Sequence, residues 1–471
     1  MAFLIGGANS AAATGGFEVA NSCRFNDGDT SKMLKEMGTA TDNKKFTFNC
    51  WLKRSTLGTN QVFAHARNGT SGPYFNMMFG TDDKLRVYGP DKDGGNDFDY
   101  KTTQVLRDVG AWYCITVAFD SSHATAGNRI RMYINGVEVT SFATETNPAE
   151  DVIYVGNYTG YDFGIGANLD NSAYFDGYIA ECVHIDGQQL TPTSFGEFDE
   201  DSPDIWKPID VSGLTFGNNG FYLDFEASDN LGNDANGGTD LTETNLAAAD
   251  QATDTPTNNF CTWNPLDNFY KGAVFSEGNC MTVQGATGKN NWITSTMALT
   301  KGKWYVEMVV PDVTTDHTNV SFGISDIVSI DATSALGDEP GSAQCGFRMS
   351  NGEKRLNDAS TSYGNSYSVG QVIGMALNLD DSEIHYYINN TVQNSGTAIS
   401  ITAVSGTRNG YYLIACGDES EVAGTIQINF GGCSGFALSS AESDADGYGN
   451  FEYAPPSGFF AICTKNLAEY G

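Results

Sequence analysis

The sequence of 471 residues has few basic side chains: 25 Lys and Arg stand against 58 Asp and Glu, which gives a formal net charge of −33. A protein that binds nucleic acid neutralises phosphates with Lys and Arg, so the composition excludes nucleic acid as a partner. An anionic membrane surface repels the chain for the same reason. Only 18% of the residues are charged while 40% are hydrophobic, which excludes an acidic disordered chain and leaves enough apolar material for packed cores.

Several familiar signals are also missing. The sequence has no run of about 20 apolar residues, so we expect no membrane insertion. Residues 1–16 have no positively charged start and only a short apolar stretch, so we expect no secretory signal peptide and synthesis in a cytoplasm. The ten cysteines form no Cys-x-x-Cys pair, which favours buried thiols over disulfides or a zinc site. Long stretches of helical periodicity are absent.

Short alternating segments separated by turn residues are what the sequence does contain, at 45–52, 113–119, 129–134, 304–310 and 425–430. Asn135-Gly136 lies between two such segments and predicts a hairpin. We therefore predict an all-β fold with two antiparallel β-sandwich (jelly-roll-like) domains joined by an acidic Asp/Asn/Gly-rich linker. The predicted parts are an N-terminal attachment segment (1–20), a first sandwich (21–226), a loop and linker (227–267) and a second sandwich (268–471).

Four segments of the first predicted sandwich follow one another in a recognisable order: FTFNCWLK at 46–53, WYCITVAFD at 112–120, MYING at 132–136 and YFDGYIAE at 174–181. Together they resemble laminin-G-like and pentraxin-like domains of the concanavalin-A-like superfamily. In that family such segments are a core strand, a strand with a buried Trp, a strand that leads into an Asn-Gly turn, and a closing strand. The resemblance implies a two-sheet sandwich.

The second predicted sandwich carries its own ordered segments: GKWYVEM at 302–308, VSFGI at 320–324, GQVIGMALNLD at 370–380, IHYYINN at 384–390, NFG at 429–431 and PPSGF at 455–459. These segments are similar to the strands of a SPRY domain. Two positions depart from the usual pattern, since Gln371 replaces an Asp and Asn390 replaces a Gly. In SPRY domains the binding surface is formed by loops at one end of the sandwich.

The two domains together resemble structural proteins of tailed bacteriophages, especially marine ones. The opening residues 1–8, the junction Asn264-Pro265-Leu266-Asp267 and the C-terminal segment 458–467 fit the same group. Such proteins are commonly tail-fibre or other surface appendage components. The resemblance implies a location on the virion and binding to a surface, and it does not identify the appendage.

Residues 229–240 concentrate oxygen-bearing side chains among glycines, and we predict a calcium site there, formed by Asp229, Asp234, Asn236 and Asp240. Calcium takes 6–8 oxygen ligands in flexible geometry, and laminin-G-like domains often hold calcium at a sheet rim. The alternative is a solvated, turn-rich loop. Residues 91–97 are a second, weaker candidate, and the sequence requires no other cofactor.

Aromatic side chains beside amides and carboxylates predict sugar or partner binding in two places. The first is the segment 157–163, with Tyr158, Tyr161, Asp162 and Phe163 as candidates, because aromatic side chains in a Gly-rich loop have few core neighbours. They could instead plug the end of the sandwich or face a neighbouring subunit. The second is the segment 360–367 with Tyr363 and Tyr367, together with 331–341. The segment 360–367 could equally be the entry to a strand.

Enzymatic activity has one weak candidate. Concanavalin-A-like glucanases place carboxylates at alternating positions of one strand, and Glu197 and Asp199 have that spacing. Their surroundings lack β-branched residues, which favours a solvated loop. The five histidines are scattered, and the chain has no nucleophile elbow, Walker loop or dinucleotide fingerprint. We therefore predict a protein that is not an enzyme.

The leading hypothesis is a non-enzymatic phage virion protein, a tail fibre or similar appendage, that adheres to host-surface glycans or proteins. Its expected partners are other virion proteins, the host-surface ligand and further copies of itself in a homo-oligomer, since many weak sites on one particle give high avidity. One alternative is capsid decoration or fibre formation through subunit contacts alone. The other is a polysaccharide depolymerase that uses Glu197 and Asp199.

Overall fold

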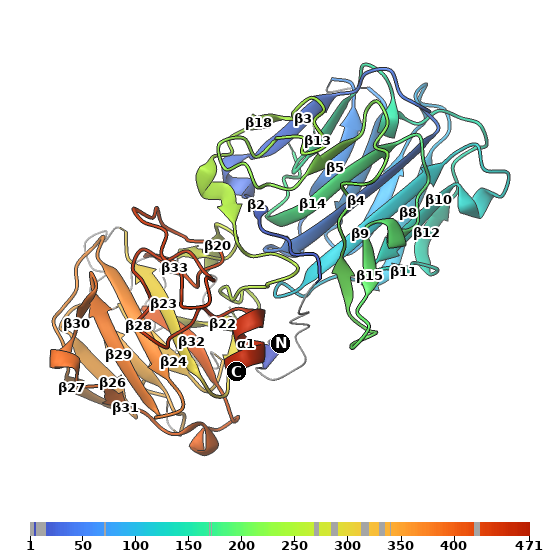
Figure 1. Ribbon diagram of the computed structural model, residues 1–471. Helices are drawn as coiled ribbons and strands as arrows, with labels where there is room; N and C mark the ends of the chain where they lie inside the picture. The colour runs from blue at the N-terminus through green and yellow to red at the C-terminus, as the bar shows by residue number, and fades with distance from the viewer. Residues whose placement is uncertain are drawn as a thin grey trace. The chain divides into compact units, whose positions relative to one another are not determined.

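The computed structural model describes residues 4–5, 16–69, 72–168, 170, 172–267, 273–283, 291–311, 320–328, 335–339, 341–418 and 424–471. The chain is nearly all β, and it divides into two compact units. The N-terminal unit is Ala13–Thr257, and the C-terminal unit is Asn258–Gly471 together with the first residues of the chain. Each unit contains two large sheets, as the two predicted sandwiches require (Figure 1).

The front sheet of the N-terminal unit has eight strands, which are in spatial order β12 (Phe142–Thr146), β8 (Phe98–Val105), β7 (Lys84–Gly89), β6 (Tyr74–Phe79), β5 (Gln61–Arg67), β13 (Asp162–Ile165), β3 (Lys32–Glu36) and β18 (Thr242–Thr244). The back sheet contains β11 (Val137–Glu138), β10 (Ile130–Ile134), β9 (Trp112–Asp120), β4 (Lys45–Arg54), β14 (Gly177–Asp186), β2 (Ser22–Phe25) and β19 (Gln251–Ala252), with β17 (Phe221–Leu223) also paired to β14. Every pairing within these two sheets is antiparallel.

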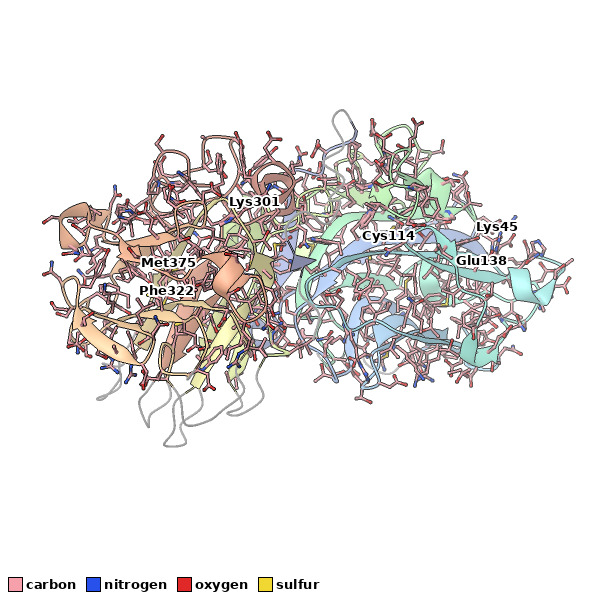
Figure 2. All side chains as sticks on the ribbon, turned by 90° about the horizontal axis from the view of Figure 1, so that it is seen from below. Lys45, Cys114, Glu138, Lys301, Phe322 and Met375 are labelled. Atoms are coloured by element: carbon pink, nitrogen blue, oxygen red, sulfur yellow. The ribbon has the colours of Figure 1, made fainter. Side chains whose placement is uncertain are left out.

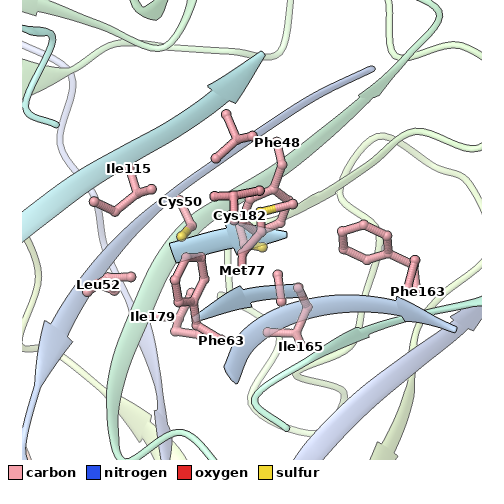
Figure 3. Packing of buried hydrophobic residues seen from close by; sticks show 14 of the residues in the cluster. Phe48, Cys50, Leu52, Phe63, Met77, Ile115, Phe163, Ile165, Ile179 and Cys182 are labelled. Atoms are coloured by element: carbon pink, nitrogen blue, oxygen red, sulfur yellow. The ribbon is translucent and has the colours of Figure 1, made fainter. Parts of the chain in front are cut away.

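The core of this unit lies between its two sheets. Alternate side chains of each strand point inward, because successive residues of a strand face opposite sides. Figure 3 shows Phe48 of β4 and Ile179 of β14 with Phe63 of β5 and Phe163 of β13 in this space. The rings of Phe48 and Phe163 are 5.7 Å apart between centroids. This packing orients the opposite side chains of the front sheet outward.

A further layer covers the outer face of the back sheet. A two-stranded sheet of β15 (Gly196–Phe198) and β16 (Trp206–Pro208) carries Trp206, whose ring lies against Gly136. Asn135 and Gly136 both have positive φ in the predicted hairpin turn between β10 and β11, and a side chain at Gly136 would overlap the Trp206 ring. The apolar segment that ends in Phe216 packs on Val183 of the same face.

Residues 227–257 are not a linker, contrary to the prediction from composition. β18 pairs with β3 and β19 pairs with β2, so this segment completes both sheets of the N-terminal unit. Its polar residues serve these pairings: Lys53 of β4 forms a fully buried ion pair with Asp254 at 2.7 Å. The composition could not show this, because Asp, Asn and Gly suit a tight, hydrogen-bonded excursion as well as a flexible tether.

The C-terminal unit has two further sheets, which we name after a central strand of each. The β24 sheet contains β1 (Leu4–Ile5), β22 (Asn291–Leu299), β32 (Tyr412–Asp418), β24 (Val320–Ser325), β25 (Cys345–Arg348), β26 (Glu353–Leu356) and β27 (Ala359–Ser362). The β28 sheet contains β20 (Val274–Ser276), β21 (Met281–Val283), β33 (Thr425–Asn429), β23 (Lys303–Val309), β28 (Val372–Asn378), β29 (Glu383–Ile388) and β30 (Thr391–Val392), with β31 (Ile399–Ser400) paired to β29. One α-helix, α1 (Thr464–Tyr470), lies near the end of the described chain.

Phe322 of β24 and Met375 of β28 represent the two buried inner faces of this unit (Figure 2). The turn after β29 uses Asn389 and Asn390, both with positive φ. Asn tolerates this left-handed conformation, which explains how Asn390 can stand where the SPRY pattern has Gly. Within the predicted attachment segment 1–20, β1 pairs in parallel with β22, and residues 1–3 and 6–15 lie outside the described residues.

The structure confirms the predicted fold class. Each of the five alternating segments named from the sequence forms a strand: β4, β9, β10, β23 and β33. All ten cysteine side chains are buried as thiols, as the absence of paired cysteine motifs indicated. No helix in the described part of the chain is long and apolar enough to cross a membrane.

Candidate functional site

The outward side of the front sheet carries polar and aromatic side chains in cross-strand rows. In one row Gly164, His65, Asn76, Tyr88 and Asp99 are successive partners across β13, β5, β6, β7 and β8. Directly opposed residues of antiparallel strands share a face, so these side chains form one continuous surface. We call this surface the tyrosine face, which comprises the outward residues His65, Arg67, Tyr74, Asn76, Arg86, Tyr88, Asp99, Lys101 and Asp162.

Two tyrosine rings occupy the middle of the tyrosine face. Tyr74 and Tyr88 contact each other edge to face, with 5.6 Å between their centroids. The guanidinium of Arg86 lies 4.0 Å from the centroid of Tyr88, and that of Arg67 lies 5.9 Å from Tyr74. All four side chains are partly exposed. Rings held in place by neighbouring guanidinium groups offer apolar surface at a low cost in conformational entropy.

Two polar side chains, His65 and Asn76, are buried beside these rings. His65 is 0% exposed and Asn76 is 3% exposed. The Oδ1 atom of Asn76 has no hydrogen-bond partner among the described residues, whereas the backbone of Ala167 lies close enough to the His65 ring to act on its pKa through a hydrogen bond. The Nδ2 atom of Asn76 donates to the Tyr88 hydroxyl at 3.2 Å. A buried polar group without a partner is costly, so a ligand that donates a hydrogen bond to Asn76 Oδ1 would remove this cost.

Burial also sets the protonation of His65. Desolvation lowers the pKa of His65 to about 4, so the imidazole is neutral at pH 7. Its ring lies against Gly164 on the next strand, where a side chain would overlap it. A neutral imidazole has one N–H donor and one acceptor nitrogen, which suits hydroxyl groups of a ligand.

Charged groups surround the rings in pairs. Arg86 binds Asp99 through two hydrogen bonds of 2.8 Å, and Lys101 contacts Asp82 at 2.6 Å. At the other side Asp162 stands opposite Glu36 on β3. Desolvation, followed by the charge of Glu36, raises the pKa of Asp162 above its ordinary value. The tyrosine face therefore presents aromatic rings, hydrogen-bonding groups and carboxylates together.

The aromatic segment predicted at 157–163 divides between surface and core. Phe163 is fully buried, with its ring centroid 4.7 Å from that of His184 and 5.7 Å from that of Phe221, so it cannot contact a ligand and the prediction for it is wrong. Tyr158 and Tyr161 contact each other edge to face and pack partly on the core, and their role in binding stays a prediction. Asp162 belongs to the tyrosine face, because it precedes Phe163 on β13.

Tyr363 and Tyr367 are core residues of the C-terminal unit, contrary to the prediction of a binding loop. Both are buried, and their rings contact Phe347. The Tyr367 hydroxyl donates to the backbone carbonyls of Val320 and Phe347. Residues 359–362 form strand β27, so only the first part of the predicted segment 360–367 lies in a strand. Residues 331–334 and 340 of the other predicted loop lie outside the described residues.

The carboxylates of Asp234 and Asp240 in the predicted calcium site bind groups of the protein itself. Asp234 is buried, and its Oδ2 atom pairs with the Lys35 ammonium at 3.2 Å while its Oδ1 atom accepts from the backbone of Tyr222. Asp240 accepts from the backbone of Asp234 and from Asn230, and Asp229 and Asn236 are exposed. No group of three or more His, Cys, Asp or Glu side chains in the described part of the chain is placed to hold a metal ion.

Residues 91–97 form a similar self-contained turn. The Asp91 carboxylate accepts from the backbone of Asp93 and Gly95 and from the side chain of Asn96. These bonds satisfy the carboxylate inside its own loop, as Asp side chains commonly do in turns. The structure therefore explains both acidic loops by hydrogen bonding within the protein.

Glu197 lies in β15, and Asp199 follows the last residue of that strand. The prediction of a loop was therefore wrong for residues 196–198. Lys207 of the partner strand contacts Glu197 at 3.4 Å and Asp199 at 3.3 Å. Desolvation raises the pKa of Asp199, but hydrogen bonds from Ser202 and Lys207 outweigh it and lower the pKa overall. A general acid for glycoside cleavage needs a raised pKa, and this arrangement has the opposite effect on Asp199.

Comparison with family models accounts for both units. Residues 26–194 match the model of the concanavalin A-like lectin/glucanases superfamily, and residues 303–426 match the SPRY domain. The chain contains a concanavalin A-like domain followed by a SPRY domain. The first match begins at the end of β2 and ends at Ser194, just before β15, so it includes β5, β6, β7 and β8 of the tyrosine face.

Solved structures with similar folds exist for both domains. The SPRY domain of human HERC1 is 13% identical, covers 35% of this chain and 96% of its own, and has a TM-score of 0.27. A putative carbohydrate binding protein from Bacteroides ovatus is 16% identical over 48% of this chain and 59% of its own, with a TM-score of 0.34. A SAP-like pentraxin from Limulus polyphemus is 13% identical over 37% of this chain and 80% of its own, with a TM-score of 0.27. A search of curated proteins finds no match.

Sequence reasoning did not find the tyrosine face of the concanavalin A-like domain. Its residues occur singly at alternate positions of separate strands, as in Tyr74-Phe75-Asn76 and Arg86-Val87-Tyr88. A polar or aromatic residue between two apolar ones is the signal that was available. It shows that one face of a strand differs from the other, but not that five strands bring such residues together.

Proposed function

We propose that the protein is a non-enzymatic surface protein of a bacteriophage virion, a tail fibre or similar appendage, that adheres to the host by binding surface glycans on its tyrosine face. The observation that carries the proposal is the combination of Tyr74 and Tyr88 with the unpartnered Oδ1 atom of Asn76. The match to a superfamily of lectins and glucanases supports the same class of ligand.

A sugar ring has apolar C–H faces and a rim of hydroxyl groups. The faces stack on partly exposed aromatic rings, here Tyr74 and Tyr88. The hydroxyl groups are donors and acceptors, so one of them can donate to Asn76 Oδ1, which has no partner among the described residues. Each such bond removes the cost of a buried group that has no partner in the protein. A ligand with many hydroxyl groups should therefore bind the tyrosine face more favourably than a purely apolar ligand, because only the former can also form these hydrogen bonds.

The role on a virion rests on the resemblance of the whole chain to phage structural proteins, and binding to other virion proteins and assembly into a homo-oligomer belong to the same proposal. Weak single sites become strong when many copies bind together. Mass spectrometry and immunogold labelling of purified particles test the location. If the protein is absent from the particles, the virion role is wrong, while the proposal of glycan binding is unaffected.

The binding site itself is tested by a glycan array with the full chain and two matched variants. Tyr88→Ala removes a ring of the tyrosine face, whereas Tyr158→Ala removes a partly buried tyrosine of the same domain outside it. We expect Tyr88→Ala to weaken binding at least about tenfold, since stacking and hydrogen bonding at one residue contribute 1–3 kcal/mol. If only Tyr158→Ala abolishes binding, the aromatic segment 157–163 is the site instead. If the native chain binds no glycan, the proposal fails.

A further inference from the structure

The charges of the tyrosine face select among glycans. Its basic side chains are already engaged: Arg86 holds Asp99 through two parallel hydrogen bonds, Arg67 contacts Asp170 at 3.3 Å, and Lys101 contacts Asp82 at 2.6 Å. The pairing with Asp99 is strong enough to raise the pKa of Arg86. Each of the cations Arg86, Arg67 and Lys101 therefore has a carboxylate beside it.

The remaining ionisable groups on this face repel anions. Glu36 and Asp162 are direct partners across β3 and β13, and two neighbouring carboxylates disfavour further negative charge. Desolvation, and after it the charge of Glu36, raises the pKa of Asp162. The net charge of −33 adds a long-range repulsion of the same sign.

From these observations we infer that the tyrosine face binds uncharged glycans built from neutral pyranose sugars, and that it rejects glycans rich in uronic acid, sialic acid or sulfate. The inference rests on the proposed function, because it names the class of sugar for the same site. A carboxylate or sulfate on the ligand would have to displace Asp99 from Arg86, which exchanges one ion pair for another and leaves Asp99 without its partner.

Neutral hydroxyl groups avoid this exchange. They donate to the Asp162 and Glu36 carboxylates, which are acceptors only when ionised, and to Asn76 Oδ1, which has no partner among the described residues. Hydrogen bonds from a neutral donor to a charged acceptor are stronger than neutral pairs. The carboxylates that exclude acidic sugars are therefore the groups that hold neutral ones.

The test measures binding of the full chain to pairs of oligosaccharides that differ only at C6: oligomers of glucose, galactose and mannose, each beside its uronic acid counterpart. We expect at least one neutral oligomer to bind at least about tenfold more tightly than its acidic counterpart, since one unfavourable charge costs 1.4 kcal/mol or more. The affinity for that neutral oligomer should change little between low and high ionic strength, because no ion pair with the ligand is formed.

Asp99→Asn provides a second, gain-of-function measurement. It removes the carboxylate that neutralises Arg86 while keeping the shape of the side chain, so we expect the affinity for the acidic oligomers to rise, by about tenfold at low ionic strength. Asp229→Asn is the matched control, because it removes the same charge from an exposed residue outside the tyrosine face. An equal rise in both variants would mean that net charge alone sets the preference, and would overturn the inference.

The remaining outcomes separate the inference from the proposed function. If an acidic oligomer binds as tightly as its neutral counterpart and Tyr88→Ala abolishes that binding, the tyrosine face is a glycan site but the inference is wrong. If no oligomer binds to the native chain or to Asp99→Asn, the proposed function fails and the inference fails with it. Tight neutral binding that Tyr88→Ala leaves intact places the site elsewhere and overturns both.

Discussion

The two units differ in what covers the outer faces of their sheets. In the SPRY unit the segment around Phe451 and Ala461 packs on Tyr305 over the β28 sheet, and Ile327 and Leu336 pack with Trp292 over the β24 sheet. Among the described residues of the concanavalin A-like unit, only the back sheet carries such an apolar layer. The front sheet instead presents the partly exposed tyrosine face. The front sheet of the first unit is therefore partly exposed on its outer face, whereas apolar segments cover part of both sheets of the SPRY unit.

A second comparison concerns one buried glutamate in each unit. Glu181 lies at a bulge of β14 and accepts from the Tyr222 hydroxyl at 2.7 Å. Glu307 on β23 accepts from the Tyr305 hydroxyl at 3.1 Å. It also accepts from the backbone N–H groups of Glu452 at 2.8 Å and Tyr453 at 2.9 Å. These backbone bonds make Glu307 an anchor for the segment around Phe451 that covers the β28 sheet. Glu181, by contrast, binds one side chain, that of Tyr222.

The same difference appears in the acidities. Burial raises the pKa of Glu181 to about 8 and that of Glu307 to about 7. Hydrogen bonds to the carboxylate favour its charged form, and the backbone bonds of Glu307 oppose the effect of burial more strongly. The number of donors on each carboxylate therefore explains the direction of the difference.

The largest expected effect contrasts a core ring with a ring of the tyrosine face. Phe163→Ala should lower the free energy of unfolding of the concanavalin A-like unit by about 4 kcal/mol, because it leaves a cavity among fully buried aromatic side chains. Tyr88→Ala, on the partly exposed side of the same sheet, should cost much less stability and should instead reduce glycan binding. Denaturant unfolding of both variants checks this, and equal losses of stability would show that the tyrosine face is part of the core.

Removal of each buried glutamate should have the next largest effect. Glu307→Ala leaves two backbone N–H groups and a hydroxyl without their acceptor, which should cost about 3 kcal/mol. Glu181→Ala leaves only the Tyr222 hydroxyl and should cost about 1 kcal/mol. Thermal or denaturant unfolding of the two variants measures the difference. A larger loss for Glu181→Ala would contradict the role of Glu307 as an anchor.

A pH dependence sharpens the comparison further. The ordinary pKa of Glu is 4.5, so above that value the unfolded chain loses a proton that the folded chain keeps until its own higher pKa. The contribution of each group to the free energy of unfolding therefore falls as pH rises, by at most about 1.4 kcal/mol per pH unit. The window runs from 4.5 to about 8 for Glu181 and to about 7 for Glu307.

Glu181→Gln and Glu307→Gln should each remove their part of this slope. Unfolding measured from pH 5 to pH 9 should show Glu181→Gln gaining on the native chain up to about pH 8, and Glu307→Gln only up to about pH 7. Parallel curves for the native chain and either variant would mean that the group has an ordinary pKa in the folded state.

The smallest expected effect is that of a single hydroxyl. Tyr88→Phe keeps the ring and removes the atom that accepts from Asn76, so glycan affinity should fall only about fivefold, as expected for one hydrogen bond of about 1 kcal/mol. Isothermal titration beside Tyr88→Ala separates the ring from the hydroxyl. A loss in Tyr88→Phe as large as in Tyr88→Ala would assign the binding to the hydroxyl and not to stacking.

Much of the fold could be predicted from the sequence, but little of the site. Alternation over 45–52 and 112–120 and the Asn135-Gly136 turn are local signals, and the corresponding strands and hairpin formed as expected. The prediction of a linker at 227–257 was wrong, because this composition suits a flexible linker and a compact hydrogen-bonded segment equally well. Only the pairing with β2 and β3 distinguishes the two. The prediction that Tyr363 and Tyr367 bind a ligand was wrong, because polar neighbours in the sequence do not show whether a ring is buried.

By itself the sequence determined the all-β class, two sandwiches and buried cysteine thiols. These properties follow from composition and from periodicity along a strand, which are local. The tertiary structure alone decided that Phe163 points into the core while its neighbour Asp162 joins His65, Tyr74 and Tyr88 outside. Alternation shows that two faces exist, but strand order and the covering layers decide which residues meet on a face and whether that face remains accessible.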